Sequence, residues 1–214
     1  VEPEAAGAPD RVELERLVAE ADTGGRQPHS RAARTVLFIV PLLWALFQLW
    51  YASPLPFQLR IGVFNATEAR AIHLAFAIFL VFAAFPATRK SPRDYVPWID
   101  WLIGLIAAGC SAYLFVFQSE LSARPGLPTT TDLVVGVLGV VLLLEAARRS
   151  IGLALPIVCL LFLAYAYFGP YMPDLFAHRG ASISRMATQY WLTSEGVFGV
   201  ALGVSTAFVF LFVL

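Results

Sequence analysis

Long apolar runs alternate with short polar connections over most of this chain. Six such runs follow one another, and most approach the roughly 20 residues that an α-helix needs to cross about 30 Å of hydrocarbon. The fourth and fifth runs flank a polar turn that contains Glu145, Arg148 and Arg149, which predicts a helical hairpin with its turn at a water interface. We expect the spans at residues 35–52, 69–86, 96–117, 133–147, 151–168 and 197–214.

Composition supports a membrane protein. Hydrophobic residues make up 58% of the sequence and the mean hydropathy is +0.71, so polar side chains are too few to cover a globule of this size. We therefore predict an all-α, polytopic integral membrane protein with about six transmembrane helices and one interfacial helix. Because the formal net charge is zero and no basic stripe is present, we expect membrane lipids but no nucleic acid among its partners.

The segment between Gly180 and Gly196 is too polar to span a membrane. Its apolar residues Ile183, Met186 and Tyr190 recur at helical spacing, which predicts a short helix. This helix lies either in the outer membrane interface or against the protein's own outer surface, and the spacing fits both alternatives equally.

Changes in composition divide the chain into four parts. Residues 1–34 form a polar cytoplasmic tail, for which a short amphipathic helix is one interpretation and a tail with only nascent helix is the preferred one. Residues 35–149 hold the first four spans. Residues 150–196 add a connecting transmembrane helix and the interfacial helix, and residues 197–214 hold the last span.

Basic residues near the span ends predict the orientation. By the positive-inside rule, the connections richest in arginine and lysine face the cytoplasm, which places the N-terminus inside. Several arginines nevertheless fall on the opposite side. Glu145 and Arg149 are four residues apart, so they can also pair on the surface of one helix. The residues expected to fix the topology and the inner turns are Arg89, Lys90, Arg93, Glu145, Arg148 and Arg149.

Few side chains inside the spans can carry chemistry. A charge at mid-bilayer is costly and usually marks a pathway, but Asp100 and Glu145 lie near inner span ends and His73 lies within about a turn of an outer end. His73 and Asp100 are therefore only minor candidates for transport residues, and a structural role is preferred. Cys110 and Cys159 lie in apolar runs, where a thiol behaves as a small hydrophobe. We predict no enzyme activity, no metal site and no cofactor.

Small residues predict where helices pack closely. In lipid, small residues at four-residue spacing let two helix backbones approach each other. The sequence does not decide whether the partner helix belongs to this chain or to another. The two stripes are Gly104, Ala108 and Ala112 in the third span, and Gly199, Gly203 and Ala207 in the last.

Five stretches, taken in order, resemble the fused permeases of TRAP transporters, with the closest likeness to the TAXI branch. In that branch a four-helix small subunit and a large subunit form one polypeptide. The resemblance covers residues 35–214, and the combination of stretches is specific although no single one is. The stretches are residues 70–77 (RAIHLAFA), 124–132 (RPGLPTTTD), 144–156 (LEAARRSIGLALP), 165–173 (YAYFGPYMP) and 192–205 (LTSEGVFGVALGVS).

The resemblance implies a permease component of a secondary transporter for organic acids in the bacterial inner membrane. It also implies ion coupling, with sodium as the expected ion, and a periplasmic substrate-binding protein that delivers the solute. In that family the part that corresponds to residues 35–149 is a scaffold, and the substrate and sodium sites lie in the large subunit. Residues 197–214 correspond to the start of that subunit, so the sodium site is expected outside this chain and the remainder of the subunit is an expected partner.

A second interpretation belongs to a different class. The chain would be a self-contained membrane adaptor or assembly protein without transport activity. A reading frame that continues past Leu214 with further spans and broken helices would favour the permease.

Overall fold

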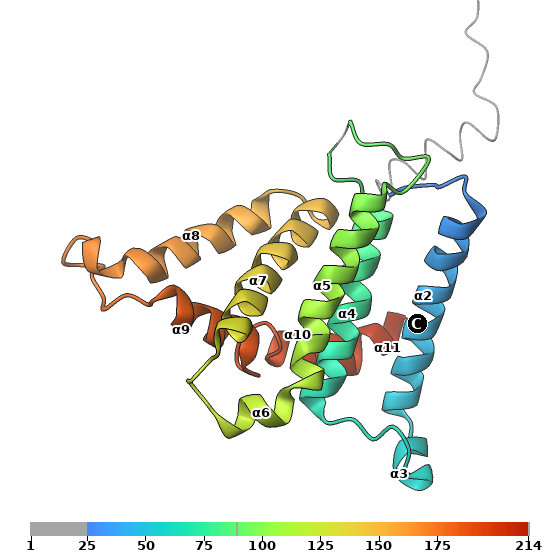
Figure 1. Ribbon diagram of the computed structural model, residues 1–214, viewed down its shortest axis with the longest axis horizontal. Helices are drawn as coiled ribbons and strands as arrows, with labels where there is room; N and C mark the ends of the chain where they lie inside the picture. The colour runs from blue at the N-terminus through green and yellow to red at the C-terminus, as the bar shows by residue number, and fades with distance from the viewer. Residues whose placement is uncertain (1–24, 89, 214) are drawn as a thin grey trace, which may run out of the picture.

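The computed structural model describes residues 25–88 and 90–213, and all regular structure in these ranges is helical (Figure 1). Five of the described helices are long and apolar enough to cross a membrane, the last with the help of a 3-10 turn, η1 (Gly169–Tyr171). The predicted class, an all-α polytopic membrane protein, is confirmed. The five are α2 (Arg31–Ala52), α4 (Ala66–Ala84), α5 (Trp98–Val116), α7 (Thr130–Ser150) and α8 (Ala154–Phe168).

Three spans, α2, α4 and α7, begin earlier than the apolar pattern predicts, and polar residues cap the last two. Asn65 Oδ1 accepts a hydrogen bond from the Glu68 backbone N–H at 2.9 Å, and the Glu68 carboxylate accepts one from the Asn65 N–H at 2.8 Å. Thr129 and Asp132 form the same reciprocal pair before α7. Each pair satisfies two backbone donors that lack a helical acceptor, so α4 and α7 each gain about one turn at the N-terminus.

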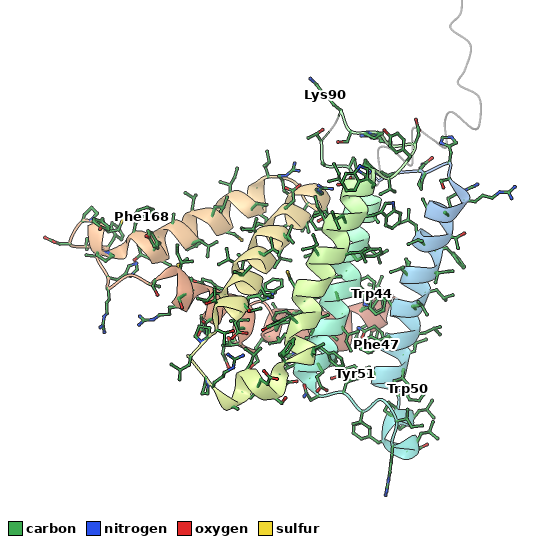
Figure 2. All side chains as sticks on the ribbon, in the orientation of Figure 1. Trp44, Phe47, Trp50, Tyr51, Lys90 and Phe168 are labelled. Atoms are coloured by element: carbon green, nitrogen blue, oxygen red, sulfur yellow. The ribbon has the colours of Figure 1, made fainter. Side chains whose placement is uncertain are left out.

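The connections gather at two opposite ends of the bundle. The short helices α3 (Leu55–Leu59) and α6 (Gln118–Ala123) lie at one end, with Trp50 and Tyr51 beside α3 (Figure 2). The loop between α4 and α5, with Lys90 at its tip, lies at the other end. Interfacial aromatic residues and a basic loop at opposite ends are the arrangement expected of two membrane faces.

Helices α4 and α5 pack side by side through the centre of the bundle. Their contact is close at Gly104, where an added Cβ would lie 3.3 Å from Phe82 Cβ. Phe82 is fully buried and joins Ile78, Ala107 and Ala146 in one apolar cluster of α4, α5 and α7. Because burial of apolar surface does not drive helix association in lipid, close packing and polar contacts hold these helices together.

The first and fifth spans lie on the two sides of this centre. Helix α2 packs against α4 through aromatic rings, with Trp44 and Phe47 both beside Phe76 at centroid distances of 6.5 and 6.3 Å. Helix α8 leaves the bundle at a wide angle and contacts mainly α7 (Figure 1). Most of its apolar side chains are exposed, as in a helix that faces lipid.

The last apolar run is shorter and more broken than the single helix that the sequence predicts. It crosses behind α5 and α4 and ends beside α2 (Figure 1). Its helical part, Val200–Val213, is shorter than a straight crossing of a bilayer core requires. The elements after residue 182 are α9 (Ile183–Ala187), the π-helical turn η2 (Thr188–Leu192), α10 (Val200–Val204), the π-helical turn η3 (Ser205–Val209) and α11 (Phe210–Val213).

We call residues 183–213 the crossing segment. Trp191 anchors it to the bundle. Its side chain is fully buried, and its Nε1 donates to the Cys110 backbone carbonyl in α5 at 3.1 Å. Gly139 of α7 makes room for the indole, since a Cβ there would lie 2.2 Å from the Trp191 ring. The segment before Gly196 therefore packs against α5 and α7 of the protein itself.

Replacing Gly139 by alanine should destabilise the protein, because the new methyl group overlaps the Trp191 ring. Overpacking of this kind costs about 1–3 kcal/mol, so the melting temperature in detergent should fall, as measured by intrinsic fluorescence. Gly109→Ala is the matched control, since no atom of α5's neighbours lies within 4 Å of the added Cβ. Equal melting temperatures for the two variants would contradict the packing of Trp191 on α7.

Candidate functional site

Asp100 is the centre of an ionic cluster at the end of the bundle where α4 and α7 finish and α5 begins. It lies in the first turn of α5 and is only 5% exposed. Arg26 donates to its Oδ2, and Arg149 Nη1 donates to its Oδ1 at 2.8 Å. Two guanidinium groups therefore flank one buried carboxylate.

Arg26 reaches this carboxylate from the segment before α2. Its Nη1 also donates to the carbonyls of Phe82 and Ala83 at 3.1 and 3.3 Å, in the last turn of α4. In the sequence Arg26 is one flanking charge among several, so its role was missed. The only signal for this contact in the sequence is Asp100, a carboxylate in an apolar run. Arg26 and Asp100 are 74 residues apart.

Glu145 forms ion pairs with both arginines that follow it on α7. Its carboxylate accepts from Arg148 Nε at 2.7 Å and from Arg149 Nε at 2.8 Å, as the four-residue spacing of Glu145 and Arg149 allows. Arg148 Nη2 also donates to the Ala87 carbonyl at 2.6 Å, which ties α7 to the connection after α4. The Arg149 guanidinium lies 4.7 Å from the centre of the Phe82 ring, a cation–π contact. We call Arg26, Asp100, Glu145, Arg148 and Arg149 the ionic cluster.

The other residues expected to fix the topology lie in the α4–α5 connection. Arg89 lies outside the described residues. Lys90 is exposed at the tip of the loop (Figure 2). Arg93 is half-buried, and its carbonyl accepts a hydrogen bond from the Gln27 N–H at 3.0 Å. The segment before α2 thus pairs with the α4–α5 connection, and this pairing places Arg26 in the ionic cluster.

His73 lies about two turns inside α4, deeper than expected, because α4 begins at Ala66. Its side chain is buried, and Nδ1 faces two donors on α2, Trp44 Nε1 at 3.2 Å and Gln48 Nε2 at 3.0 Å. With Nδ1 as the acceptor, the proton of a neutral ring lies on Nε2. His73 therefore joins α2 to α4 as a hydrogen-bond acceptor.

Gln48 extends this contact to the crossing segment. Its Nε2 also donates to the Thr206 carbonyl, in the π-helical turn η3, at 2.9 Å. Phe210 packs on the same side, with 4.5 Å between its ring centroid and that of Trp44. The Gln48 Oε1 atom is buried without a partner in the described part of the chain. Sequence reasoning missed Gln48, although a polar amide in an apolar span is itself a signal for a hydrogen bond between helices.

The first small-residue stripe packs within the chain. Gly104 lies against Phe79 and Phe82 of α4. Ala108 packs on the edge of the apolar cluster around Phe82, and Ala112 is half-buried. The close approach predicted for this span is thus made to α4.

The second stripe is not a continuous face. Gly199 precedes α10, and Ala207 lies in η3, whose wider π-helical turn moves residues four apart off one line. Gly203 instead leaves room for Arg70 of α4, because a Cβ there would lie 2.6 Å from Arg70 Nη2. Arg70 Nη1 donates to the Phe198 carbonyl at 2.9 Å, so α4 binds the crossing segment through a charged side chain.

Asp132 anchors the opposite end of the bundle. It is fully buried, and it accepts hydrogen bonds from Tyr113 Oη at 2.5 Å and from the Thr129 N–H at 2.7 Å. Tyr113 binds Oδ1, and Arg124 Nη1 lies 3.0 Å from Oδ2, the oxygen that also accepts from Thr129. The start of α7, the end of α5 and the intervening loop therefore meet at one carboxylate.

These arrangements hold helices together. Asp100, Asp132 and Glu145 are each paired with arginine, and the described residues contain no group of three or more His, Cys, Asp or Glu side chains that could hold a metal ion. A scan against protein-family models and searches of curated proteins and solved structures gave no match.

Replacing Asp100 by asparagine should destabilise the protein strongly, because Arg26 then stays buried without its counter-charge and Arg149 keeps only Glu145. Breaking a buried ion pair in this way costs about 3–5 kcal/mol. Thermal unfolding in detergent should show a large drop in melting temperature. Asp94→Asn is the matched control, since the Asp94 side chain is 63% exposed in the connection before α5. A drop of the same size in both variants would mean that Asp100 is not the buried centre of the cluster.

Proposed function

We propose that this chain is the bracing part of a membrane permease of the TRAP type, in which it supports helices that carry out ion-coupled uptake of organic acids. The observation that carries the proposal is that three carboxylates near its spans are taken up in ion pairs with arginine. Asp100 and Asp132 are committed to ion pairs between neighbouring elements, and Glu145 pairs with Arg148 and Arg149 on its own helix. Intramembrane charges that move a solute usually line a pathway, whereas paired charges of this kind suit a rigid frame.

The order of the five sequence stretches supports the same proposal. Two of them supply contacts between elements. Residues 124–132 supply the Arg124–Asp132 pair, and residues 144–156 supply Arg148, which binds the Ala87 carbonyl, and Arg149, which binds Asp100. The stretch at residues 70–77 contains both Arg70, which binds the crossing segment, and His73, which binds α2. These residues have a bracing role that does not require a solute.

The crossing segment provides a link between a brace and a moving unit. It is held at three places along its length, by Trp191 on α5, by Arg70 on α4 and by Gln48 on α2. Alternating access needs one part of a transporter to move against another that stays fixed. The crossing segment is attached to three helices of the bracing part. It is therefore suited to hold the helices of a large subunit against that part while they move.

In the proposed orientation the ionic cluster faces the cytoplasm of a bacterium and α6 faces the periplasm. The basic α4–α5 loop supports it by the positive-inside rule, and Trp50 and Tyr51 lie at the opposite end (Figure 2). A periplasmic substrate-binding protein would then approach the end that carries α3 and α6.

Single cysteines at Lys90 and Ser122 test the orientation. Cys110 and Cys159 are first replaced by alanine, and intact spheroplasts are treated with an impermeant maleimide. We expect labelling of position 122 and no labelling of position 90, because only the former faces the periplasm. Labelling of position 90 without position 122 would reverse the proposed topology. Permeabilised cells provide the control, since both positions should then react.

Uptake tests the transport role. The chain is tagged and purified from membranes of its own cell together with whatever helices accompany it, and the assembly is reconstituted into vesicles. We expect uptake of an organic acid that requires both an inward sodium gradient and a periplasmic binding protein. A His73→Gln variant should keep the same KM, because His73 joins helices and does not contact the solute.

Two results would contradict the proposal. Purification of the chain without transporting helices, with no uptake under any gradient, would favour the membrane adaptor. Normal amounts of folded protein with an altered KM in His73→Gln would place the solute site in this part of the permease.

A further inference from the structure

Helix α3 and the turn that follows it expose a row of large apolar side chains. We call residues 53–64 the apolar loop. Every second residue from position 55 to position 63 is apolar and at least 45% exposed, namely Leu55, Phe57, Leu59, Ile61 and Val63. A contiguous exposed patch of this kind marks a surface that a membrane or a partner covers.

The apolar loop is fixed against the bundle by other residues. Trp50 Nε1 donates to the Gly62 carbonyl at 3.3 Å, which ties the loop back to the end of α2. Phe64 packs against Phe47 of α2 and Phe115 of α5, with centroid distances of 5.8 and 6.0 Å. These contacts hold the loop in one place and leave its row of apolar side chains on the outside.

The length of α2 places this loop at the membrane surface. Arg31 and Arg34 lie in the first turn of α2, so its apolar part runs from Thr35 to Ala52. A helix over those residues rises about 27 Å, which is close to the thickness of a hydrocarbon core, about 30 Å. Figure 1 shows α3 directly beyond the end of α2. The apolar loop therefore falls in the headgroup layer and continues the lipid-facing surface of α2.

Helix α6 lies at the same end of the bundle and presents the opposite kind of surface. Its sequence is QSELSA, and Ser119, Glu120 and Ser122 are exposed. Side chains of this kind suit a segment that faces water. The row of apolar side chains is therefore particular to the apolar loop and is not a general property of the connections at this end.

The charge of the apolar loop suits a lipid surface. Arg60 is the only charged residue between Ser53 and Asn65, and it is exposed. A long basic side chain can lay its stem along apolar surface and keep its guanidinium at the level of the lipid phosphates. No carboxylate in the loop opposes an anionic headgroup.

We propose that the apolar loop lies in the membrane interface, with its row of apolar side chains at the boundary between headgroups and acyl chains and Arg60 at the lipid phosphates. An interfacial segment is held by its buried apolar area and by attraction to anionic lipids. The loop keeps this end of α2 at a fixed depth in the bilayer. The inference does not rest on the proposed transport function, and it holds for either orientation of the chain.

Fluorescence quenching tests where the loop lies. In the full chain, Cys110 and Cys159 are replaced by alanine, and Phe57→Cys or Ser122→Cys is labelled with NBD maleimide. The protein is placed in nanodiscs of phosphatidylethanolamine and phosphatidylglycerol, whose two faces are both open to solutes. We expect aqueous iodide to quench the probe at position 122 several-fold more strongly than the probe at position 57. A lipid with a nitroxide near the top of its acyl chain should quench the probe at position 57 more strongly.

Two results would overturn the proposal. Equal quenching by iodide at the two positions would show that the apolar loop faces water. Weak quenching of the probe at position 57 by both iodide and the nitroxide lipid would show that protein, and not lipid, covers the loop.

A pair of charge variants tests the role of the apolar row itself. With the probe on Leu59→Cys, Phe57→Glu should raise quenching by iodide several-fold, because a carboxylate is costly among acyl chains. Ser122→Glu adds the same charge at the same end of the bundle and should leave the quenching at position 59 unchanged. Equal effects of the two variants, or no effect of Phe57→Glu, would contradict anchoring by the apolar side chains.

Discussion

A carboxylate placed inside a bundle of apolar helices has to be paired, and this requirement organises the protein. An unpaired charge in a medium of low dielectric is costly, whereas a charge that meets guanidinium donors at hydrogen-bond distance can be kept there. Asp100 meets two of them, Arg26 and Arg149. Since these arginines come from the segment before α2 and from the end of α7, one buried carboxylate fixes two other parts of the chain to the start of α5.

The same principle operates on a smaller scale throughout the bundle. Asp132 holds the other end of α5 and α7 together through Tyr113 and Arg124. His73, Gln48 and Arg70 fasten α2 and the crossing segment to α4 with hydrogen bonds to ring nitrogen and backbone carbonyl acceptors. In lipid such polar contacts and close small-residue packing replace the hydrophobic drive of a soluble core. Polar contacts therefore hold the helix bundle together at both ends and in the middle.

The sequence predicted the parts of this fold that depend on local patterns. Five spans appear where long apolar runs occur, and the Glu145–Arg149 pair follows from a four-residue spacing on one helix. Contacts between distant residues were not predictable in this way. Arg26 looks like any flanking charge, and Trp191 looks like one residue of an interfacial helix until Gly139 and the Cys110 carbonyl are brought to it.

The last apolar run shows a second limit of pattern reasoning. Hydropathy measures how apolar a segment is, but not its direction or its hydrogen-bond register. Residues 197–214 are apolar enough for a span, yet Gly199 lies before the helix and the π-helical turn at Ser205–Val209 changes the spacing of the faces. The polar acceptor that Gln48 binds, the Thr206 carbonyl, lies in that turn. Such a break is set by tertiary contacts rather than by the composition of the segment.

The central claim is that Arg26 and Asp100 stabilise each other inside the bundle, and a double-mutant cycle tests it most directly. We compare the free energy of unfolding of four proteins in the same detergent: the wild type, Arg26→Gln, Asp100→Asn and the double variant. We expect a coupling energy of about 2 kcal/mol. The double variant should lose less free energy of unfolding than the two single variants lose together. A coupling energy near zero would show that the two side chains do not meet, and would contradict the account.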